Sequence, residues 1–257
     1  MKNITKALTI NAESRGVKEA VLHSIKNINL FINDLPKSGK IGIVTGFYIP
    51  SYKVCETDGP AGSASLASTF KNLGYDVTLI TDKLSANVVR IAAEIAGVHF
   101  FEADESSKLD FDVLVYIERG GANKDGLSKT MRNITVEGQV CLFRDSPVSL
   151  AIGDGGNEEG TGSTEFCELL KNVPHIEDIA AHHAAKHILF ANVSNFGALA
   201  VCKCLNAQKD EIKKIYFKVL EETNKIGSCD GINANKDCSV DNYTKEQQEE
   251  IISMIFA

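Results

Sequence analysis

The chain has 257 residues with a globular composition, 44% hydrophobic and 24% charged, and a net charge of −7. A chain of this length can bury a large core. The negative charge argues against non-specific binding to nucleic acid or to an anionic membrane surface, and no stretch is apolar for long enough to span a bilayer. Seven cysteines occur without a CxxC pair, and the first residues lack the apolar segment of a secretory signal. We therefore expect reduced thiols and a cytoplasmic protein.

The elements expected in the first half of the chain begin with a helix over 17–32, which has apolar residues at helical spacing. A short buried strand at 40–45 and a long loop follow, and Pro60 suits the first turn of a helix that stops at Gly74. A strand at 76–82, a helix at 86–96 and a short strand at 98–101 complete this half.

The second half continues the alternation of strands and helices. We expect strands at 111–118, 139–143, 148–152 and 187–193, and helices at 164–171, 195–205, 210–224 and 245–254. This order predicts an α/β fold with a mainly parallel, Rossmann-like three-layer sheet and helices on both faces. We expect one domain over residues 1–257, with residues 1–36 forming a helical segment packed on it.

Polar loops follow the predicted strands, and the carboxyl ends of parallel strands meet at one edge of a sheet, where ligands bind. The most unusual loop runs from Gly153 to Gly160 and contains four glycines and three acidic residues. Glycines let a ligand approach the backbone closely, whereas crowded carboxylates call for a compensating cation. That cation could be a substrate ammonium or a divalent metal, and the alternative is a self-contained turn that caps the next helix.

Four motifs in register resemble the D-glutamate cyclase family, specifically its C-terminal catalytic-like domain. They are Glu56–Gly62, Glu118-Arg119 with Asp125-Gly126 and Met131-Arg132, Gly153–Glu158, and Ser194–Gly197. The resemblance extends from the first strand to Asp230-Gly231. It implies an α/β fold and the conversion of D-glutamate to 5-oxo-D-proline with loss of water.

The sequence departs from this family at a few positions. Family members often have an arginine where Ala122 stands and apolar residues where Glu159 and Thr161 stand, and a tryptophan is commoner at Phe196. If the absent arginine binds a substrate carboxylate, the substrate of this chain differs from D-glutamate.

Lactam formation requires a base for the amine, an activated γ-carboxylate, and stabilisation of the oxyanion and the departing hydroxide. Candidate catalytic residues are Glu56, Asp58, Glu118 and Asp154. Candidate substrate-binding residues are Thr45, Gly59, Arg119, Asp125, Arg132, Gly155, Gly156, Asn157 and Asn195, the two arginines being suited to carboxylates. Asp154 and Glu158 are candidate ligands for Mg²⁺ or Mn²⁺, although no cofactor is required by the sequence.

Several of these residues also have a purely structural interpretation. Asp58 and Asn195 precede helices and could serve as caps, Glu118-Arg119 could be a local ion pair, and Asp125-Gly126 is a turn signal. Outside the motifs, His183 and His187 stand four residues apart, as a metal pair on a helix would, but the residues that follow have a strand pattern, which argues against a histidine metal site.

The favoured hypothesis is a hydro-lyase that cyclises a small acidic amino acid such as D-glutamate. The alternatives are a metal-dependent phosphotransferase or phosphatase and a non-catalytic, small-ligand-binding homologue. The phosphate hypothesis is weakened because no GxxxxGK[ST] motif is present and the acidic loop would repel phosphate. We expect no nucleic-acid or membrane partner, and the sequence is compatible with a homo-oligomer.

Overall fold

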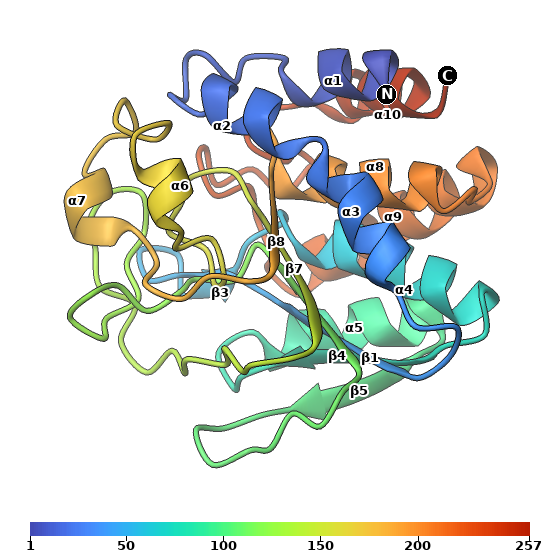
Figure 1. Cartoon of the computed structure of the whole chain (residues 1–257), viewed down its shortest axis with the longest axis horizontal. Helices are drawn as coiled ribbons and strands as arrows, with labels where there is room; N and C mark the ends of the chain where they lie inside the picture. The colour runs from blue at the N-terminus through green and yellow to red at the C-terminus, as the bar shows by residue number, and fades with distance from the viewer.

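A six-stranded parallel sheet organises the chain, as a computed structural model covering residues 1–257 shows (Figure 1). Its strands are β1 (Lys40–Thr45), β4 (Asp76–Thr81), β5 (His99–Glu102), β6 (Val113–Ile117), β7 (Val148–Gly153) and β8 (His187–Phe190). They are arranged in the order β5-β4-β1-β6-β7-β8. A two-stranded antiparallel pair, β2 (Tyr48–Ile49) and β3 (Val54–Cys55), lies in the loop after β1. The predicted α/β class is confirmed.

Ten helices accompany the sheet. They are α1 (Lys2–Leu8), α2 (Lys18–Ser24), α3 (Asn27–Asp34), α4 (Pro60–Asn72), α5 (Ala86–Ala96), α6 (Thr164–Cys167), α7 (Ile176–Ile179), α8 (Ser194–Cys204), α9 (Lys209–Lys225) and α10 (Lys245–Phe256). Pro60 occupies the first turn of α4 as expected, and Gly97 ends α5 with a φ of 65°. Helices α1 and α10 lie against each other, which brings the two ends of the chain together (Figure 1).

The two faces of the sheet are covered differently. On one face, apolar residues of the strands pack against helices through side chains such as Phe70 of α4 and Val89 of α5. On the other face, a smaller cluster around Leu114 and Tyr116 contains no helical residue and is covered by loop residues such as Leu142. We expected helices on both faces, whereas the second face is covered by loops.

The connections between the strands explain this difference. From β1 the chain passes through α4 to β4 and through α5 to β5, and then returns to β6 on the opposite side of β1. Crossovers between parallel strands are right-handed, so the connections within β1-β4-β5 and those within β6-β7-β8 lie on opposite faces of the sheet. The connections at 103–112 and 118–147 contain no helix, so the second face is covered by loops.

Some predicted elements need correction. Residues 139–143 do not form a strand. Leu142 packs onto the face of the sheet beside Tyr116, so this segment does not pair with either edge strand, β5 or β8. The helix predicted over 17–32 is two helices, α2 and α3, and Ser24 at the end of α2 accepts a hydrogen bond from the backbone N–H of Phe190 at 2.9 Å. Helix α6 is shorter than expected and α7 was not predicted, whereas α1 lies within the expected N-terminal helical segment.

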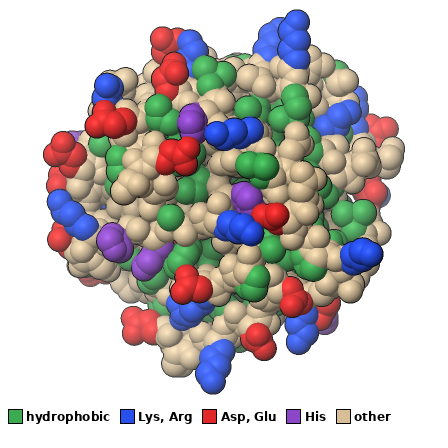
Figure 2. Space-filling model, viewed as in Figure 1, with side chains coloured by type: hydrophobic (Ala, Val, Ile, Leu, Met, Phe, Trp, Pro, Cys, Tyr) green, Lys and Arg blue, Asp and Glu red, His purple; other side chains and the backbone are tan.

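Strands β1 and β6 are neighbours at the point where the strand order reverses. The loops that leave their carboxyl ends therefore diverge to opposite faces and leave a crevice, the usual ligand position in such sheets. None of the helices has both the length and the apolar character needed to cross a membrane. Acidic and basic side chains are interspersed on the face shown in Figure 2.

Candidate active site

A cavity of about 290 Å³ lies at this crevice. Its charged lining consists of the carboxylates Glu56, Glu118, Asp154 and Asp241 and the guanidinium groups Arg15 and Arg132, and apolar walls come from Phe47, Ile49, Met131, Ile134 and Ile232. The volume is at the lower end of the range for small-molecule sites, which suits a ligand the size of an amino acid.

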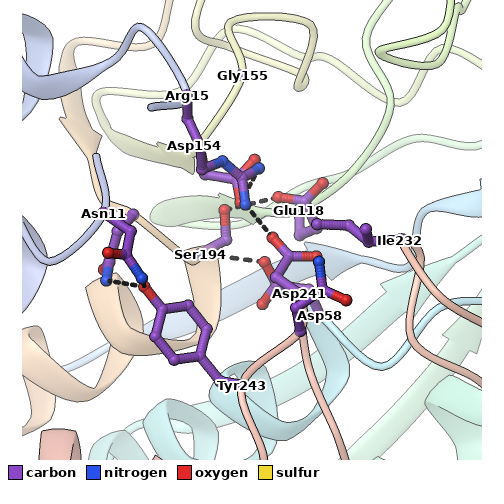
Figure 3. A network of polar contacts seen from close by, with 12 residues as sticks. Asn11, Arg15, Asp58, Glu118, Asp154, Gly155, Ser194, Ile232, Asp241 and Tyr243 are labelled. Atoms are coloured by element: carbon purple, nitrogen blue, oxygen red, sulfur yellow. Dashed lines mark hydrogen bonds and ion pairs between the residues drawn. The ribbon is translucent and has the colours of Figure 1, made fainter. Parts of the chain in front are cut away.

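Arg15 is the cation at the centre of the acidic wall (Figure 3). Its guanidinium lies 2.7 Å from Oδ2 of Asp154 and also pairs with Asp241. The turn that carries Arg15 is held by Tyr243, whose hydroxyl accepts a hydrogen bond from Asn11 at 3.1 Å. The N-terminal and C-terminal turns thus meet over the loop that follows β7.

Glu158 holds the glycine-rich loop in shape. One of its carboxylate oxygens accepts hydrogen bonds from the backbone N–H groups of Asp154 at 3.0 Å and Gly155 at 2.7 Å, and the other accepts from Gly156 at 2.8 Å. Both oxygens of this predicted metal ligand are therefore committed to the backbone. Gly156 has a φ of 89°, which favours glycine, and Asn157 lines the cavity.

Asp58 and Asn195 cap each other's helices. The carboxylate of Asp58 accepts hydrogen bonds from the backbone N–H groups of Ser194 at 2.9 Å and Asn195 at 2.8 Å, at the start of α8. In return, Oδ1 of Asn195 accepts from the N–H groups of Gly59 at 3.0 Å and Gly62 at 2.7 Å, at the start of α4. These two predicted site residues lie behind the cavity lining and join two helix N-termini.

Glu118 follows β6 with a φ of 41°, an uncommon conformation for a residue other than glycine. Its carboxylate accepts a hydrogen bond from the hydroxyl of Ser194 at 2.6 Å. A Cβ at Gly59 would approach Cβ of Glu118 to 2.9 Å and the Thr45 hydroxyl to 2.8 Å. Gly59 and the fully buried Thr45 therefore serve close packing behind Glu118 and do not line the cavity.

Two other predicted ligands of the substrate lie outside the cavity. Arg119 is fully buried and donates hydrogen bonds to the Asp82 carboxylate and the Val140 carbonyl, each at 2.7 Å. Asp125 is exposed in a turn, where its N–H donates to the side chain of Asn123 at 3.0 Å. Arg132, by contrast, reaches the cavity and donates to the Ile232 carbonyl at 3.2 Å.

Burial and mutual repulsion change the acidity of this cluster. Burial, with the nearby charge of Asp241, raises the pKa of Asp58 to about 7. Burial and neighbouring carboxylates also raise the pKa of Glu56 and Glu118 well above the ordinary value. The pKa of Asp154 rises through burial despite its pairing with Arg15. Asp58 can therefore exchange a proton near neutral pH, and Glu56, Glu118 and Asp154 hold a proton more readily than ordinary carboxyl groups do.

A family model described as D-glutamate cyclase-like, C-terminal, matches residues 4–256. The chain belongs to the D-glutamate cyclase-like family. A comparison with curated proteins gave no significant match.

Family membership confirms the resemblance inferred from the four motifs, and the match covers both terminal segments that complete the cavity. Arg15 and Asp241 were not predicted from sequence. The dipeptide Asp241-Asn242 is a turn signal, and both residues have a positive φ, but no pattern placed that turn at the cavity.

The carboxylates of Asp58, Asp154 and Asp241 place oxygen atoms within 4.8 Å of one another. Oxygen donors are what Mg²⁺ and Mn²⁺ require. However, the oxygens of Asp58 already accept backbone hydrogen bonds, and Arg15 pairs with the other two residues. A divalent cation would therefore compete with Arg15 for this position in the D-glutamate cyclase-like chain.

Proposed function

We propose that the chain is a hydro-lyase that cyclises D-glutamate, or a closely related acidic amino acid, to 5-oxo-D-proline. Family membership supports a reaction of this general kind. The observation that carries the specific reaction is the amino-acid-sized cavity, whose buried carboxyl groups have raised pKa values around one arginine.

The stoichiometry of the reaction calls for such a set of groups. The ammonium of glutamate loses two protons as nitrogen forms its bond to Cδ, the carbon of the γ-carboxylate. The γ-carboxylate loses one oxygen, which leaves with two protons as water. The protein must therefore carry protons from nitrogen to oxygen within a few ångströms, and carboxyl groups with a pKa near the working pH are suited to that role.

We assign the proton transfer to Glu56 and Glu118. No protein group donates a hydrogen bond to the Glu56 carboxylate, which faces the cavity and is free to accept a proton from the amine. Glu118 is held by Ser194 and, in its protonated form, can donate to the departing oxygen. Arg132 at the cavity wall is the group suited to the α-carboxylate of the substrate.

Arg15 supplies the positive charge that a metal would otherwise provide. It pairs with Asp154 and Asp241, and its guanidinium is suited to stabilise an oxyanion on the carbon of the γ-carboxylate. Asp154 holds Arg15 in this position, and the substrate ammonium completes the charge balance.

The test is formation of 5-oxoproline from D-glutamate by the purified chain, without added metal and with Mg²⁺ or Mn²⁺. We expect turnover, and we expect Glu56→Gln and Arg15→Met each to lower kcat/KM by about a hundredfold or more. The matched control is Glu137→Gln, an exposed glutamate outside the cavity, which should retain wild-type turnover.

Absence of turnover under all metal conditions, together with D-glutamate binding in a calorimeter, would indicate a non-catalytic binding homologue instead. Release of phosphate from a phosphate ester would favour the phosphatase hypothesis. Wild-type turnover in Glu56→Gln would show that this residue does not carry the proton.

A further inference from the structure

Three potential metal ligands converge on the loop-covered face of the sheet, apart from the cavity. They are Cys141, Glu159 and His183, which come from three different loops. None of them lines the cavity of the candidate active site. Glu159 is the neighbour of Glu158, but its carboxylate contacts the other two residues and not the glycine-rich loop.

The distances between the three ligand atoms match a tetrahedral metal site. Sγ of Cys141 lies 3.7 Å from Oε1 of Glu159 and 3.9 Å from Nδ1 of His183, and Oε1 lies 3.4 Å from Nδ1. Zinc bonds to sulfur, nitrogen and oxygen at tetrahedral angles would place these atoms about 3.4 to 3.6 Å apart. Binding would require shifts of only a few tenths of an ångström.

The same geometry does not fit a nucleophile relay. In a cysteine–histidine–carboxylate triad, each of the two ring nitrogens contacts one partner. Here Nδ1 of His183 faces both the thiol and the carboxylate. The three groups therefore point at one common position, as ligands do.

Glu159 provides a second, independent indication of a cation. The residue is 1% exposed, and its Oε2 is buried without any hydrogen-bond partner. A buried carboxylate oxygen without a donor is costly unless a cation is bound beside it. No lysine or arginine pairs with Glu159, and the only charged partner is His183.

The surroundings of the cluster keep the ligands in place and leave one side open. The ring of Phe143 stacks on His183 with a centroid distance of 4.8 Å and an interplanar angle of 4°. The backbone N–H of Glu159 donates to the Arg119 carbonyl at 2.6 Å. Cys141 and His183 face a surface hollow, so water can reach a fourth coordination position.

We propose that Cys141, Glu159 and His183 bind a zinc-class divalent ion, with water as the fourth ligand. One thiolate, one carboxylate and a neutral imidazole neutralise a divalent charge, and sulfur with nitrogen favours Zn²⁺ over Mg²⁺ or Mn²⁺. The ion joins three loops on the face of the sheet that has no helix, so its binding stabilises the cover of that face.

Metal binding is measured on the untagged full chain, stripped with a chelator and titrated with Co²⁺ as a spectroscopic probe and then with Zn²⁺. We expect one ion per chain, a thiolate-to-cobalt charge-transfer band, and a higher melting temperature that the chelator reverses. Cys141→Ser should abolish the charge-transfer band, and Glu159→Gln and His183→Asn should each weaken binding by at least about tenfold.

Cys167→Ser is the matched control, because Cys167 is an exposed thiol that is not part of the cluster, and this variant should bind the ion as the wild type does. Circular dichroism establishes that each variant is folded. If the variant of the buried Glu159 fails to fold, His183→Asn tests the site, because the His183 side chain is partly exposed. A wild-type chain without the charge-transfer band, or equal bands in wild type and Cys141→Ser, would overturn the proposal.

Discussion

Arg15, Arg119 and Arg132 have different surroundings, which give them different functions. Arg15 and Arg132 line the cavity, whereas Arg119 is sealed in the interior beside Asp82. We expected Arg119 to bind substrate because a guanidinium at the end of a buried strand can grip a carboxylate by bidentate hydrogen bonds. The same position also suits a buried ion pair, and the side chain makes that pair.

We predict that Arg119→Met lowers the free energy of unfolding by about 3 to 5 kcal/mol, because it leaves the Asp82 carboxylate buried without its partner. Turnover per folded molecule should stay near that of the wild type. Urea unfolding followed by circular dichroism measures the loss. Arg90→Met is the control, because Arg90 is half exposed over the ring of Phe100, and it should cost less than about 1 kcal/mol. Equal losses in the two variants would contradict the buried-pair interpretation.

Asp58 and Asn195 join the N-termini of α8 and α4 behind the cavity. Their main effect is therefore on the stability of these two helices. We predict that Asn195→Ala lowers the free energy of unfolding by about 2 kcal/mol or more, because the N–H groups of Gly59 and Gly62 lose a buried acceptor. KM for substrate should change little, since Asn195 does not line the cavity.

The exposed cap of α10 provides the comparison for this prediction. Thr244 forms a capping box with Gln247, and Thr244→Ala should cost about 1 kcal/mol. Chemical denaturation of both variants measures the difference. A larger loss of stability for Thr244→Ala than for Asn195→Ala would contradict the role of Asn195 as a buried cap. A large rise in KM for Asn195→Ala would show that Asn195 acts at the substrate.

Most elements could be predicted because their signals are local. The strands β1, β4, β6 and β7 are short apolar runs, and α4 and α5 are delimited by Pro60 and Gly97. Residues 139–143 have the same apolar character, but Leu142 packs on the face of the sheet and the segment extends neither edge strand, because pairing partners are set by the whole fold. The sequence likewise could not tell that Glu158 and Glu159 face different neighbours, because that depends on a loop conformation.

At the scale of the molecule, the strand order brings the loops after β1, β6 and β7 together, and this convergence was predictable from the alternation of strands and helices. The closure of the cavity by the two terminal segments could not be predicted from the sequence. Arg15 and Asp241 are separated by 226 residues and meet because α1 packs on α10. Neither turn has a periodic pattern, and their contact depends on helix packing far from the site.

The buried acids should make the whole molecule more stable in mild acid than at neutral pH. The pKa of Asp58 is about 7 in the folded chain, against an ordinary value of 3.8, so between these values the folded chain binds more protons than the unfolded chain. The free energy of unfolding therefore falls as the pH rises through this window, by up to about 1.4 kcal/mol per pH unit for each proton concerned. Glu56, Glu118 and Asp154 act in the same direction, since their pKa values are also raised.

Urea midpoints measured from pH 5 to pH 8 test this prediction. We expect the midpoint to decrease steadily up to pH 7, and we expect Asp58→Asn to make that decrease shallower by about one proton, because the neutral amide has no charge to bury. Asp110→Asn, at an exposed position, is the control and should follow the wild-type profile. A midpoint that rises from pH 5 to pH 7, as is usual for proteins with ion-paired carboxylates, would mean that Arg15 compensates the acidic cluster in full and that its carboxyl groups are ionised at neutral pH.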